Sequence, residues 1–204
     1  MNSQKPYQTH TSLLTIKQIG ELLSQQLGIN CYDKELIQLA SRDSGLGKEF
    51  FEKADEKSSH GFFSTFFGFR SGYMGDINYL CNENLFKIQS DVIKDLAEKE
   101  SCIFVGRCAD YILRNHPQCL NIFITATLED RIQRICQALE LTEKESLTLI
   151  EQTDKKRADY YNYYSNKVWG MATSYDLCIN SSVFGMDKIL SIIQEYVSVN
   201  YCNV

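Results

Sequence analysis

Apolar residues recur every three to four positions in three long stretches of the chain, a spacing typical of helices that bury one face. These stretches are 16–27, 84–100 and 186–201. Gly28 directly follows the first stretch and predicts the C-terminal end of that helix. Thr127 and Thr142 each precede an acidic residue by three positions, a pattern that predicts the beginning of a helix.

Short apolar runs lie between these helices and predict strands. They cover 29–32, 102–105, 121–125 and 175–180, and a further helix is expected from Lys34 to about Ser41. Strands that alternate with helices indicate an α/β fold with a parallel sheet flanked by helices. The 204 residues contain no interdomain linker or internal repeat. We therefore expect a single domain over residues 1–204.

Composition excludes several classes of protein. The net charge of −5 implies no broad basic surface, so nucleic acid is not expected as a main partner. The apolar runs are far shorter than the ~20 residues needed to cross a bilayer, and residues 1–6 lack the apolar stretch of a signal peptide. We expect a cytoplasmic protein without membrane contact. The eight cysteines form no Cys-x-x-Cys pair, so we interpret them as buried free thiols and expect no metal site.

Polar side chains follow the predicted strands at the ends where parallel sheets bind ligands. Asp33 follows the first strand, and Arg107 and Asp110 follow the second. Arg131 and Arg134 come after the third strand and lie one helical turn apart. Phosphoryl transfer needs cations around the developing charge and a carboxylate for the metal or the acceptor. These residue types therefore indicate phosphoryl transfer as a candidate chemistry.

Most of these residues also have a purely structural interpretation. Asp33 precedes a predicted helix and could be its N-cap. Arg131 and Arg134 could be solvated helix charges, and so could the basic run at 155–157. Arg107 is harder to explain in this way, because it follows a glycine at a buried strand end where a guanidinium needs an anionic partner.

Two aromatic-rich segments could contact a ligand. Residues 57–81 combine glycines and aromatic residues without a clean period, which fits either a loop with local packing or a mobile flap that stacks on a base. The run 160–167 contains four tyrosines, more than simple core packing needs, and it could form one face of a lid.

Three separated segments, in the expected order, resemble the cytidylate-kinase-like family of P-loop proteins. They are Gly-Ile-Asn-Cys-Tyr-Asp-Lys-Glu-Leu-Ile at 28–37, Val-Gly-Arg-Cys-Ala-Asp-Tyr-Ile-Leu at 105–113 and Asp-Lys-Lys-Arg-Ala-Asp-Tyr-Tyr at 154–161. The resemblance covers roughly residues 19–195. It implies a P-loop-kinase-like three-layer sandwich that transfers the γ-phosphoryl group of ATP to CMP or dCMP with Mg²⁺. A small-molecule nucleotide is the implied partner, and the oligomeric state stays open.

The resemblance also implies a flap that binds the acceptor at about 45–82 and a lid at about 153–174. Asp33, Arg107 and Asp110 would bind the acceptor nucleotide. Cys108 stands where the family usually has aspartate after Gly-Arg, which leaves the choice of acceptor base open.

The lid would supply the catalytic residues Asp154, Lys156 and Arg157. Consecutive helical residues point ~100° apart, so they cannot all face one ligand. We expect Arg157 to face inward as the phosphate contact, with Asp154 orienting it and Lys155 in solvent.

The glycine-rich phosphate loop of the family is missing from its expected place. Residues 7–18 contain no glycine, although a phosphate loop needs inward backbone N–H groups on a chain that glycine bends freely. A catalytically inactive relative, an altered coding start, or an unusual phosphate site that uses Lys17 would each explain this. Arg131 and Arg134 are further candidate phosphate contacts. We expect an impaired nucleoside monophosphate kinase; the alternative is a non-catalytic nucleotide-sensing or protein-interaction module.

Overall fold

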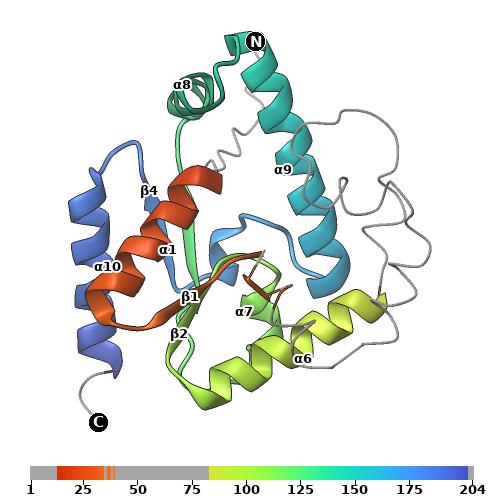
Figure 1. The fold of residues 1–204 in the computed structure, drawn as a ribbon, viewed down its shortest axis with the longest axis vertical. Helices are drawn as coiled ribbons and strands as arrows, with labels where there is room; N and C mark the ends of the chain where they lie inside the picture. The colour runs from red at the N-terminus through yellow and green to blue at the C-terminus, as the bar shows by residue number, and fades with distance from the viewer. Residues whose placement is uncertain (1–12, 35, 38, 40–82, 202–204) are drawn as a thin grey trace. The chain divides into compact units, whose positions relative to one another are not determined.

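The computed structural model describes residues 13–34, 36–37, 39 and 83–201 (Figure 1). The predicted flap at 45–82 lies outside these residues, and so does the first half, 7–12, of the segment where a phosphate loop was expected. The chain divides into two compact units, one formed by 1–31 with 103–204 and the other by 32–102. The described part is mixed α/β and mostly helical.

The first unit contains most of the described elements. Its helices are α1 (Leu13–Leu27), α7 (Ala109–Ile112), α8 (Leu128–Leu139), α9 (Glu143–Ser165), the 3₁₀ turn η1 (Ala172–Ser174) and α10 (Met186–Tyr201). Its strands include β3 (Ile122–Thr125) and β4 (Leu177–Asn180). Strands β1 (Asn30–Tyr32) and β2 (Cys102–Phe104) contain the boundaries between the units, and α6 (Glu83–Lys99) belongs to the second unit.

Local sequence signals explain where several helices begin and end. Gly28 has a φ of 67°, a left-handed conformation that ends α1 as predicted. Before α9, the Glu145 backbone N–H donates to the Thr142 hydroxyl, and the Thr142 backbone N–H donates to the Glu145 carboxylate. This capping box confirms the predicted beginning of α9. Before α8, Thr127 makes the first of these two bonds, because its hydroxyl accepts from the Asp130 N–H.

The described strands form two small sheets, whereas the sequence predicted one. β3 and β4 are parallel, with Ile122 opposite Leu177 and Thr125 opposite Asn180. β1 pairs with β2 in the other sheet. The predicted strands are in the right places, but each observed strand is shorter than its apolar run.

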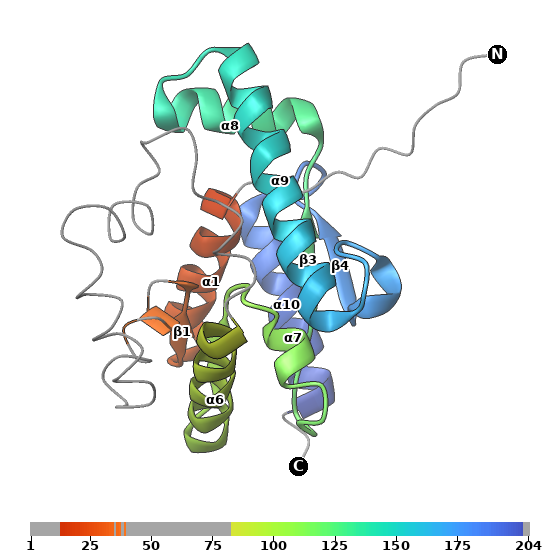
Figure 2. The same cartoon turned by 90° about the vertical axis from the view of Figure 1, so that its right-hand side faces the viewer.

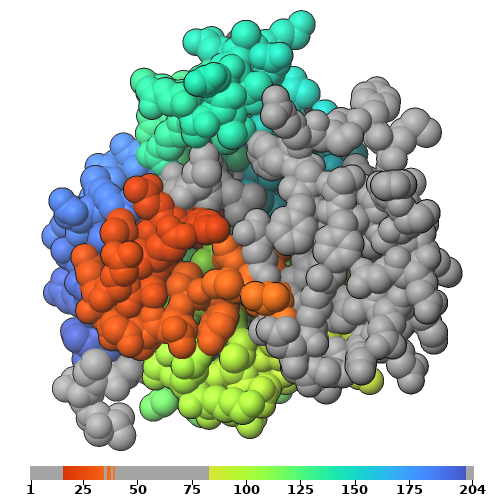
Figure 3. Space-filling model, in the orientation of Figure 1, coloured from red at the N-terminus to blue at the C-terminus, as the bar shows by residue number. Residues whose placement is uncertain are grey.

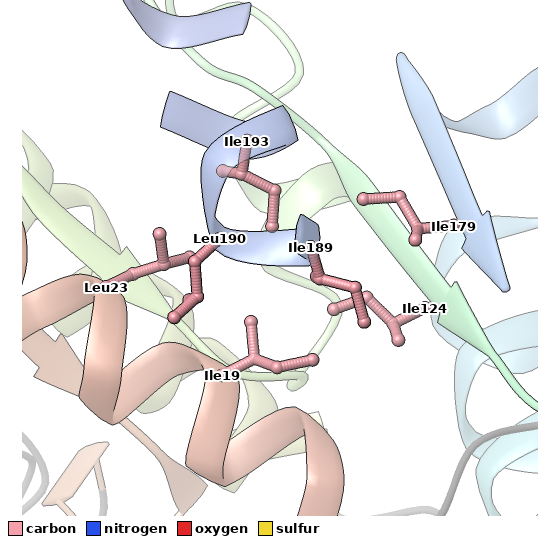
Figure 4. Close-up of a cluster of buried hydrophobic side chains, with 7 residues drawn as sticks. All are labelled: Ile19, Leu23, Ile124, Ile179, Ile189, Leu190 and Ile193. Atoms are coloured by element: carbon pink, nitrogen blue, oxygen red, sulfur yellow. The ribbon is translucent and has the colours of Figure 1, made fainter. Parts of the chain in front are cut away.

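A core of branched apolar side chains joins α1 and α10 to the parallel strands. Figure 4 shows Ile19 and Leu23 of α1 and Ile189, Leu190 and Ile193 of α10 directed toward Ile124 and Ile179. All seven side chains are buried. The outer surfaces of α1 and α10 are adjacent in the space-filling view (Figure 3). Helical periodicity therefore correctly predicted the buried faces of both helices.

Close approach of α1 to the strands depends on Gly20. A Cβ added at this glycine would lie 3.0 Å from the Cys31 Sγ and 3.2 Å from the Val105 Cγ2. Both distances are tighter than ordinary van der Waals contact, so a larger residue would push α1 away from β1 and from the end of β2.

The opposite side of β3 is aromatic. Phe123 stacks on Tyr175 with ring centroids 4.8 Å apart, and Trp169 meets the Phe123 ring edge-on at 6.1 Å. Side chains alternate between the two faces of a strand, so Ile124 faces the core and Phe123 faces the segment that follows α9. β3 is thus covered on both faces.

The cysteines only partly match their predicted role. The six cysteines in the described part of the chain are free thiols, and Cys108 is buried. Cys178 is exposed, which contradicts the prediction of burial. It lies in β4 beside the buried Ile179, and the alternation of side chains along a strand turns it away from the core. No helix in the described segments is long and apolar enough to span a bilayer.

Candidate functional site

A turn of unusual backbone conformation follows β2. Gly106, Arg107 and Cys108 have φ values of 79°, 58° and 55°, so three consecutive residues are left-handed. This conformation costs roughly 1–2 kcal/mol for each residue that has a Cβ. The Ala109 and Ile112 backbone N–H groups donate to the carbonyls of Gly106 and Cys108 and lead the turn into α7. Arg107 is therefore held at the carboxyl end of β2, where a ligand was expected.

The Arg107 guanidinium lies against an aromatic ring of α9. Its Cζ is 5.5 Å from the centroid of the Tyr160 ring, within the range of a cation–π interaction. Burial raises the pKa of Tyr160 well above its usual range, and the positive charge of Arg107 opposes this shift. The phenol is neutral at physiological pH, and its ring supports the guanidinium.

Cys108, which replaces the usual aspartate of the family, is a packing residue. Only 4% of its surface is exposed. Burial, together with the nearby Asp110 charge, raises the pKa of its thiol to about 12, and Arg107 opposes the shift. Because the thiolate is the reactive form of cysteine, this thiol is neither a nucleophile nor a metal ligand at neutral pH.

Asp110 is bonded to α9. Its Oδ2 accepts a hydrogen bond from the Tyr161 hydroxyl at 2.7 Å. Burial raises the pKa of Tyr161 far above its usual range, and the hydrogen bond to Asp110 raises it further. The Tyr175 oxygen, on the segment before β4, accepts from the Gly170 N–H at 3.4 Å. The Asp110–Tyr161 bond joins α7 to α9.

A second charged cluster joins α8 to α9, which are neighbouring helices (Figure 2). Arg131 donates two hydrogen bonds to Asp154, at 2.7 and 2.8 Å, and the Arg157 Nη1 lies 3.7 Å from the Asp154 Oδ1. Arg131 is 3% exposed, and its Nε is buried without a hydrogen-bond partner. This cluster has one carboxylate for two guanidinium groups.

Burial shifts the arginine pKa values of this cluster downward. For Arg131, the nearby Asp154 carboxylate opposes the effect of burial. For Arg157, burial and the neighbouring Arg131 lower the pKa to about 10, and Asp154 opposes them. Both guanidinium groups are protonated at neutral pH, and the bidentate geometry indicates that Asp154 is ionised.

The orientation of the basic run agrees with the geometric prediction. Arg157 is half-buried and lies beside Asp154, whereas Lys155 and Lys156 are exposed. An exposed Lys156 could reach a ligand only by way of its long side chain. The catalytic roles of Asp154, Lys156 and Arg157 stay predictions.

Arg134 has a structural position at the ends of β3 and β4. Its guanidinium donates to the Ser181 hydroxyl and carbonyl, both at 3.2 Å, and lies 3.7 Å from Asp130. The Ser181 hydroxyl donates in turn to the Thr125 carbonyl at 3.0 Å. These bonds tie α8 to the strand ends, so Arg134 is less suited to phosphate binding than the sequence suggested.

Asp33 caps the helical turn that follows β1. Its Oδ1 accepts from the Leu36 N–H at 3.0 Å, and its carbonyl accepts from the Ile37 N–H at 2.9 Å. The structural interpretation of Asp33 is thus correct, and its role in substrate binding stays a prediction. Lys17 is half-buried on α1. Asp33 belongs to the second unit, whereas Arg107, Arg131 and Arg157 belong to the first.

The sequence did not predict the pairing of Asp110 with Tyr161 or the role of Tyr175. Tyr161 lies four positions after Arg157 and therefore shares its helix face, which was the available signal. Within the described ranges, no group of three or more His, Cys, Asp or Glu side chains could hold a metal ion.

Known proteins resemble this chain in sequence and in fold. A model of the cytidylate kinase-like family matches residues 16–183. The chain is similar to a cytidylate kinase of Archaeoglobus fulgidus, with 30% identity over 131 residues that cover 60% of this chain and 68% of that protein. It is also similar to the crystal structure of an uncharacterized protein from Eubacterium ventriosum, with a TM-score of 0.69, 24% identity and coverage of 90% and 92% of the two chains. At that identity, this structural likeness supports the fold alone.

Proposed function

Because the chain belongs to the cytidylate kinase-like family, we propose that it binds a nucleoside monophosphate at Arg107 and transfers phosphoryl groups from ATP slowly or not at all. The observation that carries this proposal is the position of Arg107. It lies at the carboxyl end of β2 on a strained turn and against the Tyr160 ring. Strained backbone of this kind is concentrated at functional sites.

The proposal includes the three-layer architecture of a P-loop kinase. Helices α1 and α10 pack on one face of the parallel strands, and Phe123 of β3 meets Trp169 and Tyr175 on the other. These contacts lie within the first unit; the single domain of 1–204 and the lid at about 153–174 are part of the proposal.

Arg107 has the chemistry that an acceptor phosphate needs. A planar guanidinium can bind two phosphate oxygens with parallel hydrogen bonds. The ring of Tyr160 shields one side of it from water, and the Asp110 carboxylate is turned to Tyr161. The arginine would neutralise the monophosphate and hold it in a fixed orientation, which is most of what an acceptor site contributes to phosphoryl transfer.

The cluster of Arg131, Asp154 and Arg157 fits the phosphate groups of ATP. It places two guanidinium groups beside the Asp154 carboxylate, and the buried Arg131 Nε lacks an acceptor. Arg157 is the better phosphate contact, because it is half-buried, whereas Arg131 is 3% exposed and donates two bonds to Asp154. ATP would supply the transferred phosphoryl group, and Arg157 would stabilise the negative charge that develops on it.

Two features argue against an efficient site for ATP, the phosphoryl donor. Residues 7–18 lack the glycines of a phosphate loop, and losing one hydrogen-bond donor to developing negative charge costs roughly 2.7–4 kcal/mol of transition-state stabilisation in a well-studied protease. Asp110 and Asp154 already accept bonds from Tyr161 and Arg131. They therefore do not form a set of oxygen ligands that fits Mg²⁺, and we assign no step to the metal.

The missing glycines also favour a second candidate, a non-catalytic module that senses a nucleotide or binds a protein through the retained acceptor site. The two candidates share Arg107 and differ in whether ATP is consumed.

Calorimetry tests the acceptor site that both nucleotide-binding candidates require. CMP, dCMP, UMP and AMP are titrated into the full chain, and binding of at least one of them below millimolar concentration is expected. Arg107→Ala should remove it. Arg114→Ala is the matched control, because Arg114 also lies over a tyrosine ring, at 4.2 Å from Tyr111, but is exposed. If no monophosphate binds, or if Arg107→Ala binds as well as wild type, the proposal fails.

A further inference from the structure

Two neighbouring contacts connect the Arg107 turn to α9. Arg107 lies over the Tyr160 ring, and Asp110, three residues later, accepts the Tyr161 hydrogen bond at 2.7 Å. Both tyrosines are adjacent in α9, and both partners lie within one short stretch of chain. Each contact therefore constrains the geometry of the other.

Tyr161 is the buried member of this pair of contacts. It is 6% exposed, and its hydroxyl donates a hydrogen bond to Asp110. A buried hydroxyl must keep a hydrogen-bond partner, because burying the group without one is unfavourable. At this point α9 can therefore move away from α7 only by breaking this bond.

The Tyr160 ring makes contacts of a different kind. It lies under Arg107 and also contacts Tyr164, at a centroid distance of 4.9 Å. A hydrogen bond between the Arg107 and Tyr160 side chains joins the ring to the guanidinium directly. The bond of the neighbouring Tyr161 fixes the part of α9 from which this ring projects.

We infer that Asp110 and Tyr161 are positioning residues, which hold the Tyr160 ring under Arg107 and thereby orient the guanidinium for the monophosphate. This inference rests on the proposed function. On this inference Asp110 acts through Tyr161, whereas the sequence predicted direct contact with the substrate, and the experiment below distinguishes the two roles.

The Asp110–Tyr161 hydrogen bond also affects the residue that is proposed to contact the phosphates of ATP. Arg157 lies one helical turn before Tyr161 on the same face of α9. Fixing Tyr161 against α7 therefore also fixes the direction in which Arg157 is presented. The Asp110–Tyr161 bond relates the acceptor arginine to the lid arginine.

The test separates positioning by Asp110 from direct contact with a ligand. Asparagine keeps a carbonyl oxygen that accepts from the Tyr161 hydroxyl, whereas alanine does not. If the Asp110 carboxylate instead contacted substrate or metal through its negative charge, both variants would lose that contact. We therefore compare the calorimetric titration of wild type with those of Asp110→Asn, Asp110→Ala and Tyr161→Phe. The ligand is CMP, or the monophosphate that binds wild type most tightly if that is not CMP.

Tyr161→Phe and Asp110→Ala should each weaken binding roughly tenfold, the affinity change expected from one hydrogen bond to a charged group. Asp110→Asn should bind at least as tightly as wild type. Tyr163→Phe is the matched control, since Tyr163 is 51% exposed on the same helix, and it should not change the affinity. Combining Tyr161→Phe with Arg107→Ala should weaken binding no further than Arg107→Ala alone.

Thermal unfolding of each variant shows whether it is folded. If Tyr161→Phe does not fold, Asp110→Ala carries the comparison with Asp110→Asn, because it removes the acceptor of the same hydrogen bond. Equal loss in Asp110→Asn and Asp110→Ala, or unchanged affinity in Tyr161→Phe, would overturn the inference and leave the proposed function standing. If wild type binds no monophosphate, the proposed function fails and the inference falls with it.

Discussion

Arg131 and Asp154 join α8 to α9 through two parallel hydrogen bonds of 2.7 and 2.8 Å. Arg131 is 3% exposed, so its charge depends on this carboxylate for compensation. A buried pair of this kind contributes little net stability compared with apolar residues, but removing one partner leaves an uncompensated charge. The pair therefore acts as a fixed connection on which the position of Arg157 depends.

Asp154→Ala should lower the free energy of unfolding by about 3 kcal/mol, the lower end of the range for breaking a buried pair. Denaturant unfolding measures this. Lys155→Ala is the control on the same helix; as an exposed surface residue it should change stability by no more than about 0.5 kcal/mol. The double variant Arg131→Met/Asp154→Leu should recover much of the loss. Equal stability of Asp154→Ala and wild type would contradict the importance of this pair.

Thr142→Ala should lower the free energy of unfolding by about 1 kcal/mol, because it removes the N-cap of α9. Thr148→Ala is the matched control. Thr148 is an interior residue of the same helix whose hydroxyl donates to the Lys144 carbonyl, and alanine has the higher helix propensity there. A loss in Thr148→Ala as large as in Thr142→Ala would exclude capping as the cause.

The capping box also predicts a dependence on pH. Hydrogen bonds from Thr142 lower the pKa of the Glu145 carboxyl. Because the folded pKa is below the unfolded one, this stabilising contribution is complete above the usual glutamate pKa and is lost as the pH falls through the lowered value. The stability difference between wild type and Thr142→Ala should therefore shrink in acid. A difference that stays constant down to the acid limit of folding would contradict this assignment.

Cysteine reactivity should follow burial and pKa. At pH 8, iodoacetamide should label Cys178 before Cys108, since Cys178 is exposed and the Cys108 thiol is buried with a pKa of about 12. Burial also raises the pKa of Cys178, so both reactions should be slower than that of a free thiol. Peptide mapping by mass spectrometry measures the order, and labelling in urea should remove it. Preferential labelling of Cys108 in the native protein would mean that the Arg107 turn opens.

Patterns within one element were predictable from the sequence. The apolar spacing of Met186–Tyr201 and the Thr142 capping box each depend on residues within a few positions, and both are found where predicted. The 3.6-residue geometry of a helix also predicted that Arg157 would lie beside Asp154 while Lys155 stayed exposed.

Contacts between distant elements were not predictable in this way. Asp110 and Tyr161 are 51 residues apart, and Arg134 and Ser181 are 47 residues apart. Neither pair has a spacing signal, because each depends on how helices are placed around the strands. α7 was also missed. It has four residues and follows the left-handed Cys108, so it is too short to show a helical period.

The central claim is that this chain keeps an acceptor site but has lost efficient transfer from ATP. A coupled assay of ADP formation with ATP, Mg²⁺ and CMP tests it most directly, with Arg107→Ala as the control for dependence on the acceptor site. The account predicts a turnover below about 1 s⁻¹, the lower end of the ordinary range of kinases. A CMP-dependent turnover at or above that rate, absent in Arg107→Ala, would contradict it.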